Sequence, residues 1–238
     1  MDFVFSASEY AEMSTGTFDR TFWQKLASEA ETVLEVGCGT GRVARWLIDD
    51  HDYYCVDTAM DMVEYVRDHL GLGEKARVGR IEDLVWAVQF DLVIAPANVV
   101  CHIEPEALPP FFQAAHRVLA LGGRLVVDTF NPNPVVQPRG EYVFREYVDP
   151  RDSMPVTVRC RPELHDDVQI LHLAFYKGGR LQRETELVQH MHSCPLVEEA
   201  ARNTGYVLVD RFGDYDFSPW TTGSRKQIHV FQKQVGVT

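Results

Sequence analysis

The chain has 238 residues, of which 45% are hydrophobic and 24% are charged, as in one globular domain of ordinary size that carries a sizeable insertion. Its 23 Lys and Arg against 35 Asp and Glu give a net charge of −12, which excludes nucleic acid as a bulk partner because so acidic a surface repels phosphate backbones. The five cysteines form no CxxC pair, and no stretch approaches the ~20 apolar residues that span a bilayer. The first ten residues lack the basic start and apolar core of a signal peptide, so we expect a cytoplasmic protein with no membrane contact.

Short apolar runs alternate with helical segments between Thr32 and Val127. The predicted strands are Thr32–Val36, Tyr53–Val56, Ala76–Val78, Phe90–Ala95 and a fifth that begins at Arg124, and the predicted helices are Gly41–Asp49, Met60–Leu70 and Leu108–Leu121. This alternation predicts an α/β fold, with a parallel sheet covered by helices on both faces.

The pattern changes after Asp128, where the prolines of segments 131–134 and 138–140 interrupt it. Four antiparallel strands are predicted at about 141–148, 155–161, 168–176 and 180–192, with Gly178 and Gly179 in the last hairpin. A helix at Pro195–Asn203 and strands at Tyr206–Arg211 and Gln227–Gln232 then restore the α/β pattern. We therefore expect one domain made of residues 1–130 and 194–238, interrupted by an inserted antiparallel subdomain at 131–193.

The strongest motif is Glu35-Val36-Gly37-Cys38-Gly39-Thr40-Gly41, between the first strand and the first helix. Glycines let the backbone turn tightly and approach a ligand, and a helix N-terminus offers unpaired N–H groups. The next strand ends near Asp57, whose carboxylate can accept hydrogen bonds from ribose hydroxyls. A nicotinamide-dependent oxidoreductase shares this arrangement, but its GxGxxG fingerprint would require a glycine at Arg42.

Four motifs together resemble those of class I S-adenosylmethionine-dependent methyltransferases. These are the ExGxGxG loop, Asp57, the FDLV strand at Phe90–Val93 and the RVLALGGRLVV segment at Arg117–Val127, in that order. The resemblance covers about residues 30–130 strongly and the remainder loosely. It implies a Rossmann-like, doubly wound seven-stranded sheet with an antiparallel last strand. It also implies an inserted antiparallel lid that often helps to build a homodimer, S-adenosylmethionine as cofactor and S-adenosylhomocysteine as product.

The same resemblance implies a set of cofactor-binding residues. Glu35 would reach the methionine ammonium through water, Asp57 would hold the ribose hydroxyls, and Met60 would pack on adenine. Arg80 stands where relatives often place the acid that binds the adenine amino group, so one of the two acids after Ile81 would replace it. The expected set is Glu35, Gly37, Cys38, Gly39, Asp57, Thr58, Met60, Ile81, Glu82, Asp83 and Ala95.

Two residues are candidates for catalysis. His102 follows the fourth strand in a context similar to that of amino-sugar N-methyltransferases, and a pKa of ~6.5 would let it accept a proton at neutral pH. It is otherwise a histidine that caps the next helix or fills space beneath the pocket. Tyr10 resembles a tyrosine that covers the methyl donor, or else it is a packing aromatic of an amphipathic helix.

Three residues are candidates for binding the substrate. Asn98 follows the fourth strand and either orients the substrate or caps its own loop. Tyr215 and Trp220 precede the last strand and would wall a substrate cavity or act as a latch. This last segment is similar to the ends of small bacterial methyltransferases of natural products, including a peptide N-terminal methyltransferase.

A metal site is not expected. His190 and His192 lie two apart on a predicted strand and so face the same side, and His165 and His172 lie nearby in the inserted segment. No carboxylate spacing typical of a metal motif accompanies these four histidines.

The main hypothesis is therefore methyl transfer from S-adenosylmethionine to N or O of a small molecule or short peptide, without a metal. The alternatives are a catalytically silent S-adenosylmethionine-binding protein that works through partners and, less favoured, a nicotinamide-dependent oxidoreductase. Methylation of RNA or DNA is disfavoured by the charge and by the sequence APAN at 95–98, where such enzymes carry an acidic-Pro-Pro-aromatic motif.

Overall fold

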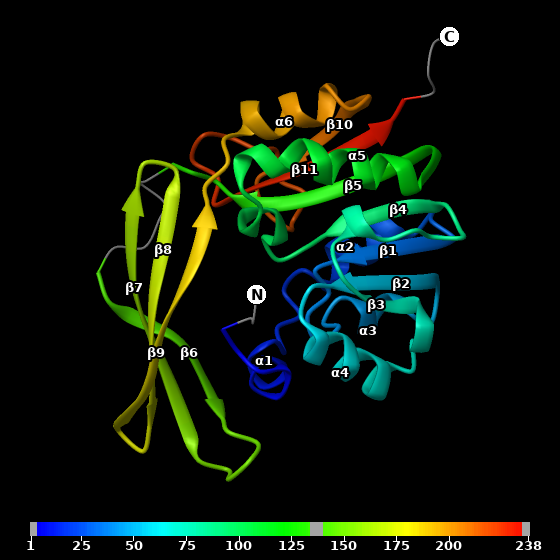
Figure 1. Cartoon of the computed structure of the whole chain (residues 1–238). Helices are drawn as coiled ribbons and strands as arrows, with labels where there is room; N and C mark the ends of the chain where they lie inside the picture. The colour runs from blue at the N-terminus through cyan, green and yellow to red at the C-terminus, as the bar shows by residue number, and fades with distance from the viewer. Residues whose placement is uncertain (1–3, 134–139, 235–238) are drawn as a thin grey trace.

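The computed structural model describes residues 4–133 and 140–234, which form two separate β-sheets (Figure 1). The larger sheet has seven strands in the order β10 (Tyr206–Phe212), β11 (Lys226–Lys233), β5 (Leu119–Phe130), β4 (Phe90–Ala95), β1 (Thr32–Val36), β2 (Asp52–Asp57) and β3 (Ala76–Val78). The strands from β5 to β3 are parallel, whereas β11 is antiparallel to both of its neighbours. The expected fold class is confirmed.

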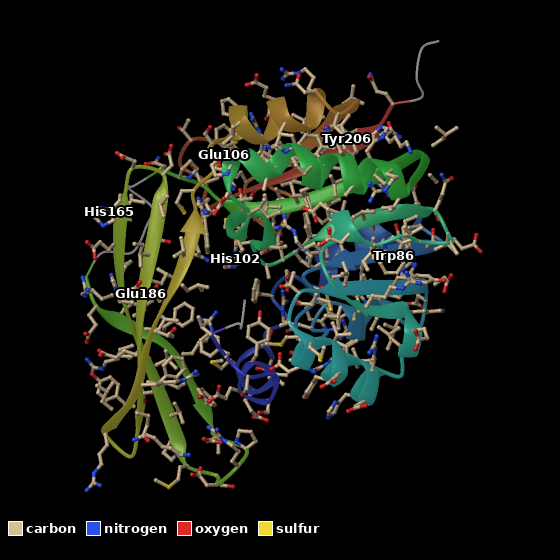
Figure 2. All side chains as sticks on the ribbon, viewed as in Figure 1. Trp86, His102, Glu106, His165, Glu186 and Tyr206 are labelled. Carbon is tan, nitrogen blue, oxygen red and sulfur yellow. The ribbon has the colours of Figure 1, made fainter. Side chains whose placement is uncertain are left out.

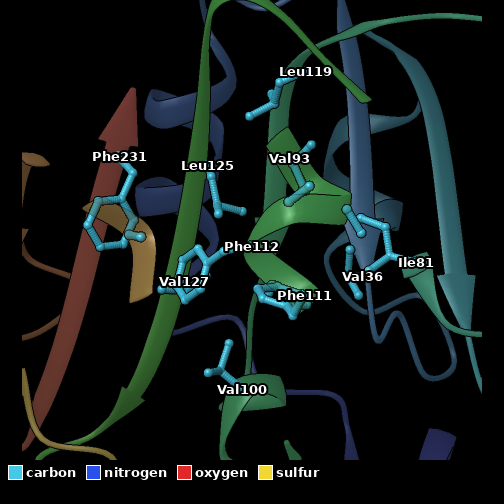
Figure 3. Close-up of a cluster of buried hydrophobic side chains, with 14 of the residues drawn as sticks. Val36, Ile81, Val93, Val100, Phe111, Phe112, Leu119, Leu125, Val127 and Phe231 are labelled. Atoms are coloured by element: carbon cyan, nitrogen blue, oxygen red, sulfur yellow. The ribbon is translucent and has the colours of Figure 1, made fainter. Parts of the chain in front are cut away.

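Helices cover both faces of this sheet. One face carries α5 (Leu108–Val118) and α6 (Cys194–Arg202), and the other carries α2 (Arg20–Ala27), α3 (Ala44–Leu47) and α4 (Met60–Leu70). Figure 3 shows the core of the first face, where Phe112 of α5 packs against Phe231 of β11, with the ring centroids 5.8 Å apart. Because both faces are covered, β1 and β4 are apolar almost throughout instead of alternating.

Two predicted helices are shorter in the structure. The helix expected at Gly41–Asp49 is reduced to α3, because residues 41–43 form turns and Gly41 adopts a φ of 76°. The helix expected to run to Leu121 ends at Val118, because Leu119 already pairs with Phe90 of β4. A cross-strand partner therefore overrides the helical pattern at that point.

The smaller sheet is an antiparallel meander of four strands, β6 (Tyr142–Val148), β7 (Pro155–His165), β8 (Val168–Lys177) and β9 (Arg180–His190). Gly178 and Gly179 have φ values of 56° and 76°, as a two-residue hairpin turn between twisted strands requires. One face is buried, where Leu173 and Phe175 pack against Phe5 and α1 (Ala7–Met13). Figure 1 shows α1 between this sheet and α4.

The smaller sheet lies between β5 and α6 in the chain, where the insertion was expected. We propose the domain division at 130/131 and 193/194, because the sheet and the strand direction both change there. Pro134 and Pro138, which mark the break in the sequence, lie outside the described residues. Within the described residues, no helix is long and apolar enough to cross a bilayer.

Candidate active site

The glycine loop after β1 leaves no room for side chains. Gly37 and Gly39 have φ values of 70° and 51°. A Cβ on Gly37 would lie 2.3 Å from Cγ2 of Val99, and a Cβ on Gly39 would lie 2.9 Å from Cε1 of Tyr10. The loop is anchored to β2, because the N–H groups of Gly37 and Cys38 both donate to the carbonyl of Val56, at 2.8 and 3.2 Å. Only glycine satisfies both the backbone conformation and the close approach.

Asp57 ends β2 directly beside this loop. Its Oδ2 accepts a hydrogen bond from the N–H of Gly39 at 2.8 Å, and its Oδ1 accepts one from the N–H of Ala59 at 2.9 Å. Burial raises the pKa of Asp57, and the N–H groups oppose that shift. Because a carboxylate has about four lone-pair sites in all, Asp57 keeps the capacity to accept a hydrogen bond from a ligand hydroxyl.

Glu35 lies beneath the loop and is 2% exposed. The hydroxyl of Tyr53 donates to its Oε2 at 2.6 Å. Burial raises the pKa of Glu35 to about 8, although the Tyr53 hydrogen bond and the charge of Arg42 act in the opposite direction. A cationic ligand above the loop would therefore favour the ionised carboxylate.

Arg42 forms a buried ion pair with Asp19, whose carboxylate also accepts a hydrogen bond from Nε1 of Trp23 at 2.9 Å. This pair occupies the position at which the dinucleotide fingerprint requires its third glycine. The side chain of Cys38 points into the core towards Cys55, so only its backbone faces the loop surface.

The predicted adenine side lies at the rim of the sheet. Met60 is 61% exposed, and Thr58 and Asp83 are also exposed. Glu82 is half-buried and pairs with Arg80 at 3.0 Å. The side chain of Ile81 is fully buried in the core, as is Ala95 at the end of β4, so these two residues offer mainly backbone atoms.

A strained turn follows β4. Ala97 and Asn98 have φ values of 57° and 62°, a conformation that is uncommon outside glycine and clusters at functional sites. The N–H of Asn98 donates to Oδ1 of Asp128 at 2.6 Å. Nζ of Lys226 donates to Oδ1 of Asn98 at 2.9 Å and to Oδ2 of Asp128 at 3.1 Å. The side chain of Asn98 is thus engaged by the protein itself.

Asp128 and Lys226 were missed in the sequence. Asp128 is fully buried at the carboxyl end of β5 and also accepts a hydrogen bond from the hydroxyl of Tyr215. The sequence did hold a signal for Asp128, because this acid directly follows the apolar run Leu125–Val127. That position is the carboxyl end of a strand, where the other candidate residues also lie. Lys226 gave no local signal, because its partners come from distant strands.

His102 ends η3 (Val99–His102), the 3-10 turn that follows this strained segment. Figure 2 shows His102 between β9 and the larger sheet. Its surface remains accessible, yet protein surrounds it on several sides, and this desolvation lowers its pKa. A polar contact with the backbone of Val188 in β9 opposes the shift, and the nearby His190 adds to it. His102 is therefore a neutral imidazole at pH 7.

Tyr10 lies on α1, with its ring against Gly39, and burial raises its pKa. The N–H of Ala7 donates to Oδ2 of Asp61 in α4 at 2.9 Å, which ties α1 to the larger domain. On the other side, Glu9 accepts hydrogen bonds from Tyr147 and Arg183 of the smaller sheet, both at 3.1 Å. Helix α1 therefore joins the two sheets over the glycine loop.

Tyr215 and Trp220 are not brought together. Tyr215 is buried against Phe22 of α2, with its hydroxyl on Asp128. Trp220 packs against the guanidinium of Arg211 at 4.2 Å, and Arg211 pairs with a glutamate of α6 on the other face of the sheet. The two aromatics do not form one wall.

The four histidines that were considered as metal ligands separate into two pairs. His165 and His172 each contact Glu163 at 2.9 Å on the smaller sheet. The rings of His190 and His192 lie 6.0 Å apart at an interplanar angle of 13°, and β9 ends at His190, so the expected strand does not continue to 192.

Among the described residues, the ligand-type atoms of Cys194, Glu198 and His229 gather within 4.8 Å of one another. Arg211 donates to Glu198 at 2.6 Å, so this group already holds a cation of its own.

Comparison with known proteins also points to a methyltransferase domain. Residues 33–123 match the family profile described as methyltransferase domain. No curated protein matches the chain in sequence.

Similar solved structures include an S-adenosylmethionine-dependent methyltransferase from Clostridium acetobutylicum ATCC 824, with 17% identity, a TM-score of 0.78, and coverage of 95% of this chain and 94% of that one. The CcbJ methyltransferase from Streptomyces caelestis has 20% identity, a TM-score of 0.75, and coverage of 93% and 98%. CalS10, an amino pentose methyltransferase from Micromonospora echinaspora whose structure holds S-adenosylmethionine, has 18% identity, a TM-score of 0.73, and coverage of 98% and 99%. At these identities the structures show a shared fold. Together with the methyltransferase-domain profile on residues 33–123, which hold the glycine loop, this shared fold supports a class I S-adenosylmethionine-dependent methyltransferase.

Proposed function

We propose that the protein methylates N or O of a small molecule or short peptide, and that an amine is the first acceptor class to test. The observation that carries this proposal is the neutral His102, which lies between the smaller sheet and the strand ends, where an acceptor would meet the donor. Supporting analogies are the amino pentose methyltransferase above and the sugar N-methyltransferase KedS8 from Streptoalloteichus sp ATCC 53650, which is 18% identical with a TM-score of 0.72.

The residues present fit the cofactor. The free lone pairs of Asp57 would take the ribose hydroxyls, and the backbone of Gly37 and Gly39 would lie along the methionyl and ribose groups. Glu35 would face the methionine ammonium, and Tyr10 would cover the donor from above the loop. The exposed side chain of Met60 would pack on adenine, with Ile81 offering its backbone.

The bound cofactor supplies a methyl group on a sulfonium, which an acceptor lone pair attacks in line with the S–C bond. The protein's task is therefore to hold the acceptor, remove its proton and keep water out. His102 would accept the proton because its ring is neutral at pH 7. The cluster of Asn98, Asp128 and Lys226 would fix the turn that carries this base.

The first test is calorimetric titration with S-adenosylmethionine and S-adenosylhomocysteine, followed by a screen of amino sugars, other amines and short peptides for S-adenosylhomocysteine release. We expect micromolar binding and turnover with an amine (roughly −8 kcal/mol at 1 μM). Binding without product from any acceptor would instead support a silent binding protein that works through partners.

A variant pair tests the base. His102→Ala is expected to keep its affinity for S-adenosylhomocysteine and to lose turnover by about 100-fold or more. His116→Ala, on the outer helix α5, is the matched control and is expected to retain full activity. Full turnover of His102→Ala would show that His102 only fills space beneath the pocket.

A further inference from the structure

His192 touches the turn that carries His102, although it lies 90 residues further along the chain. It lies two residues after the end of β9 and is 2% exposed. Its Nε2 lies 2.9 Å from the carbonyl oxygen of Ile103 and 3.2 Å from that of Val100. Because carbonyl oxygens only accept hydrogen bonds, Nε2 must carry the proton and donate to these two carbonyls, which lie on either side of His102 in the sequence.

His192 is itself held from two directions. The side chain of Gln227 in β11 donates to the carbonyl oxygen of His192. The N–H of the preceding residue, Met191, donates to the carbonyl of Asp167 between β7 and β8 at 2.7 Å. The residue is therefore fixed to the last strand of the larger sheet and to the smaller sheet at the same time.

The turn η3 has little support of its own. It contains four residues and follows two residues in the left-handed conformation. Its internal backbone hydrogen bonds run from Cys101 to Asn98 and from Ile103 to Val100, at 2.9 and 3.1 Å. A single turn with so few hydrogen bonds is marginal unless tertiary contacts hold it.

We infer that His192 is a positioning residue, which pins the turn Val99–His102 to the end of the smaller sheet and so aims His102 at the acceptor. This inference rests on the proposed role of His102 as the base. A displacement of about 1 Å in a catalytic group can cost about 100-fold in rate, so a clamp on this turn matters for turnover more than for cofactor affinity. The smaller sheet then orients the base, His102, as well as covering the site.

The clamp works with a neutral ring. Burial lowers the pKa of His192, and the neighbouring His190 lowers it further. Its contacts with the two carbonyls and the charge of Asp167 act in the opposite direction. A neutral ring protonated at Nε2 is sufficient for the geometry observed.

Three variants test the clamp. His192→Leu fills the space without a donor, and His192→Gln places an amide N–H near the position of Nε2. His165→Leu is the matched control, because His165 is an exposed histidine of the same sheet whose side chain contacts Glu163, away from the turn of His102. The first measurement is the titration of His102 by imidazole NMR in protein saturated with S-adenosylhomocysteine, which needs no acceptor.

In the wild type and in His192→Gln, we expect His102 to titrate below the ordinary pKa of 6.5 with one ring tautomer. In His192→Leu, we expect the pKa to rise towards 6.5 and the tautomers to mix, because the turn loosens and water enters. With an acceptor from the screen, kcat should fall about 10- to 100-fold in His192→Leu and largely recover in His192→Gln, while the affinity for S-adenosylhomocysteine changes less than about twofold.

An unchanged His102 titration and kcat in His192→Leu would overturn the inference. If His192→Leu does not fold, His192→Asn replaces it, because the Asn amide is too short to reach the two carbonyls. Equal His102 titration and equal kcat in the Asn and Gln variants would then overturn the inference. Failure of His102 as the base gives a different result. His102→Ala would then retain turnover, whatever the NMR titration of the His192 variants shows.

Discussion

The two sheets are stabilised in different ways. The larger sheet is buried on both faces, and its helices form two continuous apolar clusters around it. The smaller sheet is buried on one face only; its other face carries charged and polar side chains such as His172, which contacts Glu163 and Glu186 at 2.9 and 3.0 Å. Figure 2 shows His165 and Glu186 on this sheet, well away from Trp86 of the larger domain.

This difference implies that the two sheets have different roles. We expect the larger sheet to act as a platform, whose strand ends hold backbone and carboxylate groups in place for the cofactor. The smaller sheet is a cover attached by a limited set of contacts, among them those of Glu9 and His192. Substitutions in the platform should therefore act on cofactor affinity, and substitutions in the attachments should act on stability or turnover.

The largest effect is expected at the glycine loop. Gly37→Ala would force a Cβ against Val99 at a residue whose φ is 70°, so S-adenosylhomocysteine affinity should fall at least about 100-fold, or about 3 kcal/mol. The matched control is Gly71→Ala, where φ is 66° but no atom lies within 4 Å of the new Cβ. It should lose stability from backbone strain and keep its affinity, as measured by calorimetry. Equal loss of affinity in both variants would mean that strain alone matters.

Glu35 should make the platform less stable as the pH rises. The Glu35 carboxyl holds its proton more tightly in the folded state than in the unfolded chain. Its contribution to the free energy of unfolding is therefore fully present below pH 4.5 and is lost as the pH rises towards 8. Without cofactor, Glu35→Gln should gain unfolding free energy relative to the wild type as the pH rises through this range, reaching about 3 kcal/mol at pH 7. Urea denaturation at several pH values measures this, with the exposed Glu31→Gln as control. A constant difference between the two proteins would contradict the prediction.

Asp57→Asn should weaken the binding of S-adenosylhomocysteine by about 1–3 kcal/mol, because charge-assisted hydrogen bonds to the ribose are lost. Asp91→Asn is a matched control at the opposite end of the strands, where the carboxylate accepts hydrogen bonds from Thr32 and from the N–H of Glu31. It should change stability and leave cofactor affinity unaltered. An Asp57 variant with wild-type affinity would place the ribose elsewhere.

The smallest effect is expected where the cover meets α1. Glu9→Gln should lower the free energy of unfolding by about 1 kcal/mol, because Arg183 is 41% exposed and solvent screens its pairing with Glu9. Glu12→Gln, on the exposed side of the same helix, is the control. Thermal melts compare the two. A loss of cofactor affinity larger than the loss of stability would show that α1 belongs to the platform and not to the cover.

The order of elements along the chain could be predicted because the two periodicities differ. Continuous apolar runs such as Phe90–Ala95 indicate strands covered on both faces, and the alternation of residues 168–177 indicates one buried face. The glycine loop and Asp57 could be predicted for a related reason. They follow directly from the ends of adjacent parallel strands, so a short segment of sequence contains the whole arrangement.

The polar partners of the candidate site could not be predicted in this way. Asn98, Asp128 and Lys226 come from three strand ends, and His192 reaches the His102 turn from the end of the inserted sheet. Each lies in an ordinary local context, and nothing in that context specifies a hydrogen bond across 30 to 128 residues of chain.

The sequence by itself determined the fold class, the glycine loop and its acidic neighbour, because local backbone requirements and strand order specify them. Only the tertiary structure decided that Trp220 lies away from Tyr215, that Asn98 is held by Lys226 and that His192 supports the turn of His102. The physical reason is that a side-chain contact depends on how two sheets and their connecting loops pack, and that packing is settled by the whole buried surface instead of by any one segment.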